Sequence, residues 1–156
     1  MNCIAFAINI KGKQISQFKN FTFNSMVKFN GAYLGANNLG LFSLTGNTDN
    51  TEKILAELEL VMTNMGIKNP KRLRYVYIGF ESDEDLLLKL TVNESTVKTL
   101  TILANKSGQQ RTRVPVGRDV YGCYWSFHIS NPRGGRFAID SIDVLPIIRN
   151  EWNVSI

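Results

Sequence analysis

The sequence has few of the residues on which most enzymes and metalloproteins depend. Its 156 residues include one histidine, two cysteines and four prolines. A multi-histidine metal site or a catalytic triad cannot be built around His128 alone, which we interpret as structural or solvent-facing. Cys3 and Cys123 match no Cys-x-x-Cys motif, so a disulfide scaffold is excluded and a reducing compartment is favoured. We therefore predict a protein that is not an enzyme and has no cofactor.

Several further classes lack their sequence signals. No apolar run reaches the roughly 18–20 residues that span a bilayer, and no membrane contact is expected. The glycines match neither a P-loop nor a dinucleotide-binding fingerprint. The acidic segment 81–85 lacks the spacing of a calcium loop, and we interpret it as a solvated hairpin tip. These patterns leave no metal or nucleotide site to predict.

The net charge is modest at 18 − 13 = +5, and it permits an acidic partner without requiring one. Basic residues gather in two segments: Lys68, Lys71, Arg72 and Arg74, then Arg111, Arg113 and Arg118. Tyr75 and Tyr77, interleaved with the first segment, offer rings on which single-stranded nucleic acid could stack. We favour the other interpretation, in which the arginines pair with carboxylates of a neighbouring subunit or lie in water.

Alternating apolar residues indicate strands in the first third of the chain. Ile4, Phe6, Ile8 and Ile10 would share one face of a strand, which we expect to be covered on both sides. Residues 21–45 read as a three-strand meander, with its first turn at Asn30-Gly31, the strongest short hairpin signal. The segment 51–65 fits a helical template and a strand template equally, and its pattern leaves both open.

Strand patterns continue from Leu73 to the end of the chain. Leu86, Leu88, Leu90 and Val92 would share one face. The strand Arg111–Val116 is expected at a sheet edge, because Pro115 cannot donate a hydrogen bond to a neighbour. The last strand changes parity between Ile139 and Ile142, which predicts a β-bulge near Asp140-Ser141.

Together these strands predict an all-β fold with little helix. Short strands at regular spacing favour an antiparallel β-sandwich or jelly-roll-like architecture, preceded by the N-terminal β-meander. We predict a single structural domain over 1–156, with a soft boundary near 64–70 as the alternative.

Three parts of the sequence resemble small structural proteins of tailed bacteriophages. They are FNSMVKFNG at 23–31, KRLRYVYIGF at 71–80, and YWSF at 124–127 followed by FAIDSIDVLP at 137–146. Similar motifs recur in the same order in those proteins, over nearly the whole chain. The resemblance also implies a strand rather than a helix within 51–65.

What the resemblance implies is a non-enzymatic virion protein of the tail or the head–tail junction, assembled in the bacterial host cytoplasm. Its partners would be other virion proteins (tail, portal or connector) and further copies of itself in a homo-oligomeric ring. Edge strands and apolar ends suit such docking. The interface candidates are Arg111, Arg113, Pro115, Arg118, Trp152, Val154 and Ile156.

A carbohydrate-binding module is the alternative function. The segment Ile139–Val144 is similar to the last strand of galactose-binding-like jelly rolls. Trp125, Tyr121 and Trp152 would then be the aromatic platforms for host surface glycan. The alternation of Trp125 with Cys123 and Phe127 instead predicts an inward-facing core side chain.

Overall fold

The computed structural model describes residues 3–49 and 51–148, and these contain strands and turns without any helix. The predicted all-β class is confirmed. The chain divides into two compact units, 1–46 and 47–156. Whereas the sequence predicts a single domain or a boundary near 64–70, the division falls after Gly46, and 64–70 lies within the second unit. No helix in the described ranges is long and apolar enough to span a membrane.

Both units are built from short antiparallel strands. The first unit contains β1 (Ile4–Asn9), β2 (Gln14–Lys19), β3 (Ser25–Phe29), β4 (Ala32–Asn37) and β5 (Gly40–Ser43). The second contains β6 (Thr48–Asp49), β7 (Glu52–Lys53), β8 (Glu57–Glu59), β9 (Lys71–Ser82), β10 (Leu86–Val92), β11 (Ser95–Ile102), β12 (Gln109–Pro115), β13 (Trp125–Ser130) and β14 (Phe137–Ile148).

The first unit consists of the β1–β2 hairpin followed by the β3–β4–β5 meander. The predicted turn at Asn30-Gly31 joins β3 to β4. Both residues have positive φ, 46° and 82°, as a type I′ turn requires. The predicted meander is therefore confirmed.

The expectation that β1 is covered on both sides is wrong within this unit. Ile4, Phe6 and Ile8 are 52%, 66% and 65% exposed. They lie on a two-stranded hairpin that pairs β1 with β2 alone. Alternation shows which side chains share a face, but it does not show that another layer packs on that face.

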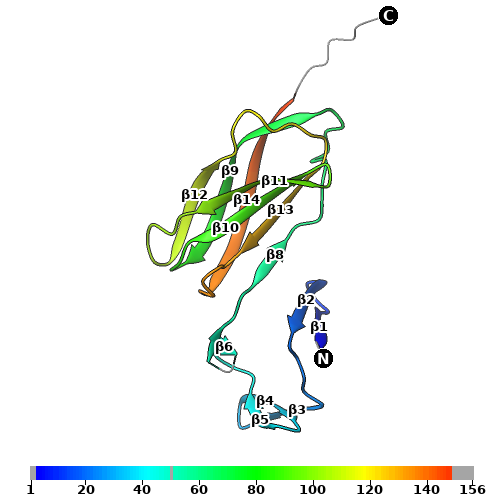
Figure 1. The fold of residues 1–156 in the computed structure, drawn as a ribbon, viewed down its shortest axis with the longest axis vertical. Coiled ribbons are helices and arrows are strands. Elements are labelled where there is room, and N and C mark those ends of the chain that lie inside the picture. Colours follow the sequence, from blue (N-terminus) through cyan, green and yellow to red (C-terminus); the bar gives the residue numbers. More distant parts are fainter. Residues whose placement is uncertain (1–2, 50, 149–156) are drawn as a thin grey trace, which may run out of the picture. The chain divides into compact units, whose positions relative to one another are not determined.

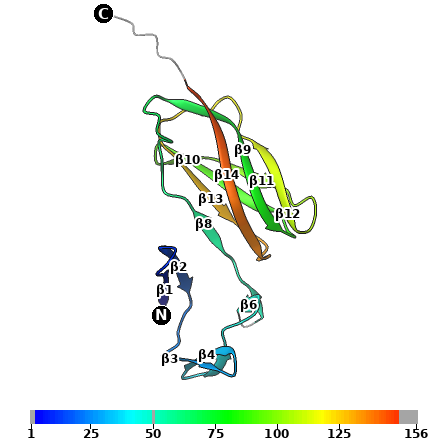
Figure 2. The ribbon, with the colours of Figure 1, turned by 180° about the vertical axis from the view of Figure 1, so that it is seen from behind.

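The second unit contains a β-sandwich (Figures 1 and 2). One sheet has the order β11-β10-β13-β8, and the other has the order β12-β9-β14. The alternating leucines of β10 share one face, as predicted; they are fully buried and face the apolar side chains of β9. The buried core comprises Leu73, Val76, Ile78, Phe80, Leu86, Leu88, Leu90, Val92, Ile102, Val114, Val116, Val120, Trp125, Phe127 and Ile129.

Irregularities in strand pairing decide which side chains of the three-stranded sheet face outward. The β14–β9 register shifts between Ile139 and Ser141, which confirms the predicted bulge. A second shift, between Val144 and Pro146, lies opposite the stretch of β9 from Leu73 to Val76. Inward-facing residues therefore change parity along β9. This second bulge turns Lys71 into the interior and Tyr75 outward.

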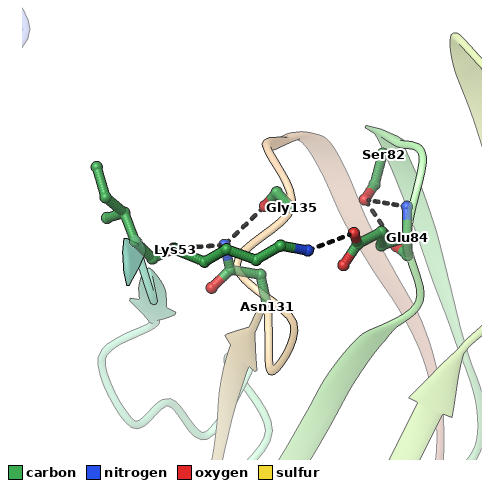
Figure 3. Close-up of polar contacts among 6 residues, drawn as sticks. Lys53, Ser82, Glu84, Asn131 and Gly135 are labelled. Atoms are coloured by element: carbon green, nitrogen blue, oxygen red, sulfur yellow. Dashed lines mark hydrogen bonds and ion pairs between the residues drawn. The ribbon is translucent and has the colours of Figure 1, made fainter. Parts of the chain in front are cut away.

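The segment 51–65 is extended, as the resemblance implied. β8 pairs with β13 at the edge of the four-stranded sheet, and Thr63 continues the pairing through a bridge to Trp125. The buried Asn131 side chain holds the start of this extended segment, 51–65, which we call the arm, in place. This side chain accepts a hydrogen bond from Ala56 N at 2.6 Å and donates to Ile54 O and Gly135 O, beside the Lys53–Glu84 ion pair (Figure 3).

An ion pair between β11 and the loop after β12 predicts a small acid-sensitive contribution to stability. The Lys98 ammonium donates to Asp119 Oδ1 at 2.8 Å and to Val116 O at 2.7 Å. The hydrogen bond from Lys98, aided by one from the backbone of Asp119 itself, lowers the pKa of Asp119 below its ordinary value. The stabilisation is therefore present above the unfolded-state pKa and is lost as pH falls through the lower folded-state pKa.

We expect Asp119→Asn to reduce the loss of stability on acidification, and the effect to be small because Asp119 is exposed. Urea unfolding midpoints at pH 6 and pH 3 measure it, with the exposed Asp83→Asn as control. Identical pH dependence in the two variants would contradict the prediction.

Candidate interaction surface

Arginines of the edge strand β12 lie over tyrosines of the neighbouring strand β9. The Arg113 guanidinium carbon is 4.6 Å from the ring centroid of Tyr75, and that of Arg111 is 5.7 Å from the centroid of Tyr77. The register places Arg113 directly opposite Tyr77, so each arginine reaches the ring diagonal to it. Arg74 adds a third guanidinium, 5.3 Å from Tyr75. We call Arg74, Tyr75, Tyr77, Arg111 and Arg113 the Tyr–Arg surface.

The local sequence explains why these side chains are accessible. Val114 packs in the core and Gln110 is buried on the same side of β12, which turns Arg111, Arg113 and Pro115 outward. β12 is an edge strand, as Pro115 predicts. The prediction for Arg111–Val116 is thus confirmed: Arg111, Arg113 and Pro115 share one face, and the strand lies at a sheet edge.

A carboxylate fixes the position of Arg111, which lies opposite Gly79 of β9. Arg111 Nη2 donates to Asp143 Oδ2 at 3.0 Å. Both partners are more than half exposed, so this pair contributes at most about 1 kcal/mol to stability. Its effect is orientation: the guanidinium is held between a ring and a carboxylate.

A shallow hollow of about 360 Å³ lies on this surface, lined by Tyr77, Arg111, Thr112 and Arg113. Arginine stacked on an aromatic ring keeps its N–H groups directed outward in a planar fork that matches carboxylates and phosphates. Of the three guanidinium groups, that of Arg111 pairs with a carboxylate, Asp143. The surface is therefore suited to an acidic partner that also presents apolar area to the rings.

The other predicted interface residues are placed as follows. Arg118 is exposed in the loop after β12, outside the Tyr–Arg surface. Trp152, Val154 and Ile156 lie outside the described residues. Lys71, grouped with the basic segments by sequence, is instead completely buried because of the bulge in β9, and it belongs to no surface.

The carbohydrate platform is only partly accessible. Trp125 is fully buried, and its Nε1 donates to Gly122 O at 3.2 Å, so it cannot stack on a sugar. Tyr121 is 43% exposed, and Arg72 lies 6.0 Å from its ring centroid. Trp152 lies outside the described residues. The inward orientation predicted for Trp125 is confirmed.

The titratable side chains singled out by sequence are dispersed. His128, on the outward face of β13, has Nε2 3.2 Å from Glu57 Oε2. The acidic segment 81–85 covers the end of β9 and the connection to β10. Because β9 and β10 belong to different sheets, this connection crosses between the sheets, and the predicted hairpin tip is wrong. Among the described residues, no group of three or more His, Cys, Asp or Glu side chains could hold a metal ion.

Sequence reasoning identified the arginines and the tyrosines of this surface separately but did not bring them together. The missing step is the β9–β12 register, which pairs Arg111 and Arg113 with residues more than thirty positions away. A signal was present in the outward positions of Arg111–Val116, which hold two arginines and no acid. Comparison of the chain with protein-family models, with curated proteins and with solved structures found no match.

Proposed function

We propose that this chain is a non-enzymatic structural protein of a tailed-bacteriophage virion, part of the tail or the head–tail junction and assembled in the host cytoplasm. It acts by self-assembly and by docking to neighbouring virion proteins of the tail, portal or connector. The motifs that carry the resemblance support the proposal, because they form the meander strand β3 and the sandwich strands β9, β13 and β14. These motifs therefore belong to strands of both units rather than to a single loop.

The observation that carries the proposal is the Tyr–Arg surface. It is an outward-facing array of tyrosine rings and guanidinium groups at a sheet edge, and the inward-facing Val76, Ile78 and Val114 of the same two strands are buried in the core. Aromatic residues and arginine are enriched where proteins bind one another. An acidic neighbour docking here would add charge-assisted hydrogen bonds to a rigid base.

Locating the chain in a particle tests the proposal. Intact-mass measurement of the purified protein and of purified particles should detect the same chain in both. Imaging of those particles should place its density in a tail or neck ring. Absence of the chain from purified, infectious particles would contradict the proposal.

Charge reversal on the Tyr–Arg surface should block docking without unfolding the protein. We expect the double variant Arg111→Glu/Arg113→Glu to enter particles at least about tenfold less than wild type, since each lost charge-assisted contact costs about 1.5–3 kcal/mol. The matched control is Arg133→Glu/Arg136→Glu, two exposed arginines near the β13–β14 turn. Particle incorporation in a complementation assay measures the effect. Equal incorporation of both double variants would exclude this surface from docking.

A further inference from the structure

The first unit exposes an unusual amount of apolar surface. Between residues 3 and 46, Gly35 alone is buried among the residues whose burial the structure describes. The large hydrophobic side chains exposed there are Ile4, Phe6, Ile8, Ile10, Ile15, Phe18, Met26, Val27, Phe29, Tyr33, Leu39 and Leu41. So small a unit cannot bury enough surface by itself, and isolated hairpins are marginal in water.

One face of the β3–β4–β5 meander is covered by its own chain. An added Cβ on Gly35 would lie 2.7 Å from the ring of Phe23, so the ring packs directly on the backbone of β4. Phe23 also contacts Phe21 edge-on at 5.0 Å and Phe42 at 5.6 Å between centroids. This aromatic cluster explains why Gly35 is buried.

The opposite face of the meander has no such cover. Val27, Phe29 and Leu41 are 55%, 68% and 68% exposed. The register places these three on one face with Leu34 and with four small residues: Ser25, Ala32, Ala36 and Ser43. We call these eight residues the apolar face of the meander. It contains no charged side chain.

The charges of the first unit lie off this face. Residues 1–46 contain four lysines and no Asp or Glu. Lys28 points to the opposite face, 5.2 Å from the ring centroid of Tyr33, and Lys11 and Lys13 lie in the β1–β2 turn. An anionic lipid or nucleic acid would need cations around the contact. The apolar face instead suits an uncharged protein surface.

We infer that the apolar face of the meander packs against the same face of a second copy of this chain. Two of the large side chains lie opposite small ones: Phe29 is opposite Ala32, and Leu41 is opposite Ala36. Two sheets related by a two-fold axis can therefore interdigitate. Val27, Phe29 and Leu41 are the large side chains that this contact would bury in each copy.

This inference rests on the proposed function, because a virion component present in many copies always has a second copy to bind. It also assigns self-association and docking to different units. The first unit would join copies of the chain, and the Tyr–Arg surface of the second would contact other virion proteins.

Two adjacent residues of β3 give a matched test. Val27 lies on the apolar face, and Met26, 64% exposed, lies on the opposite one. We expect wild type and Met26→Lys to form dimers in sedimentation equilibrium, because a two-fold contact closes at two copies. Val27→Lys should weaken association at least about tenfold, because a lysine buried in the contact would lose its hydration. Circular dichroism and urea unfolding verify that both variants fold.

A cross-linking measurement avoids any dependence on a destabilising change. In a background where Cys3 and Cys123 are replaced by serine, Val27→Cys should form an intermolecular disulfide on oxidation, and Met26→Cys should not. Equal cross-linking of the two variants would overturn the inference.

Three other results would also overturn it. The first is a wild-type protein that stays monomeric at high concentration. If a Val27→Cys thiol resists alkylation in that monomer, the residues that cover the apolar face belong to the same chain. Equal association of Val27→Lys and Met26→Lys would exclude this face. Binding of the monomer to anionic lipid vesicles, lost only in Val27→Lys, would assign the face to a membrane. None of these outcomes removes the chain from the particle, so the proposed function is tested separately.

Discussion

Replacing Lys71 by methionine should lower the free energy of unfolding by about 3 kcal/mol. The Lys71 side chain is completely buried, and its ammonium donates to Ile67 O at 3.0 Å, to Asn69 O at 3.4 Å and to Cys123 O at 2.5 Å. An ammonium has three donors, and all three are used. Methionine fills a similar volume but leaves three carbonyl oxygens without this donor.

The size of the effect follows from the cost of unsatisfied buried acceptors, about 1–3 kcal/mol each, reduced where a loop carbonyl can turn toward water. The backbone of Lys71 also exchanges hydrogen bonds with Gly122, at 3.0 Å in both directions. The side chain therefore joins the loop 64–70, the start of β9 and the segment 122–124. Its loss should loosen all three together.

Urea unfolding measures the change, and Lys89→Met is the matched control. Lys89 is exposed on β10, where a surface substitution should shift stability by no more than about 0.5 kcal/mol. Equal unfolding midpoints for the two variants would show that the interior does not require the Lys71 ammonium.

Lys71 also shows a signal that the charge pattern conceals. In the sequence it lies between Lys68 and Arg72 and counts as part of a basic segment. Its burial depends on the bulge opposite Val144 and Pro146, which changes the parity of β9. The same change is visible in KRLRYVYIGF, because Leu73 holds an odd position and Val76, Ile78 and Phe80 hold even ones, and Lys71 shares the parity of Leu73. What the sequence does not show is the three carbonyl oxygens that accept hydrogen bonds from the buried ammonium.

Features with a local chemical cause were predicted correctly. Asn30-Gly31 forms its turn because both residues tolerate positive φ. Pro115 marks an edge strand because it lacks an N–H group. The bulge near Asp140 follows from the change of parity between Ile139 and Ile142, both of which pack against the core.

Features that depend on what packs against a strand were not predictable. Ile4, Phe6 and Ile8 alternate as regularly as the leucines of β10, yet the former are exposed and the latter buried. Periodicity is the same in both cases. The difference lies in the facing sheet of the β-sandwich, which packs on the leucines of β10.

The Tyr–Arg surface was predictable only in part. The outward direction of Arg111 and Arg113 follows from alternation with Val114. Their stacking on Tyr77 and Tyr75 follows from register and could not be predicted. This is why the sequence alone favoured arginines that pair with a neighbouring subunit or lie in water, whereas the structure stacks them on its own rings.

Replacing Asn131 by alanine should also destabilise the second unit by about 3 kcal/mol. Asn131 is 4% exposed. Its amide acts as a substitute for a paired strand: Oδ1 accepts from Ala56 N at 2.6 Å, and Nδ2 donates to Ile54 O at 3.3 Å and to Gly135 O at 2.6 Å. Figure 3 shows this amide between the arm that leads into β8 and the turn after β13.

Asparagine is required because the site needs one acceptor and two donors on a short planar group. Alanine leaves one backbone N–H and two carbonyl oxygens without these partners. The control is Asn105→Ala, an exposed asparagine in the turn between β11 and β12. Unfolding midpoints in urea should differ between the variants by about 1–2 M.

Asn131→Asp distinguishes lost hydrogen bonds from lost volume. The shape is kept, but a carboxylate would face the carbonyl oxygens of Ile54 and Gly135. Burial and this repulsion should raise the folded-state pKa of the introduced carboxyl above its unfolded value near 3.9. The variant should therefore lose stability relative to wild type as pH rises through the folded-state pKa and recover as pH falls. If Asn131→Asp were as stable as wild type at pH 8, these donor contacts would not hold the arm in place.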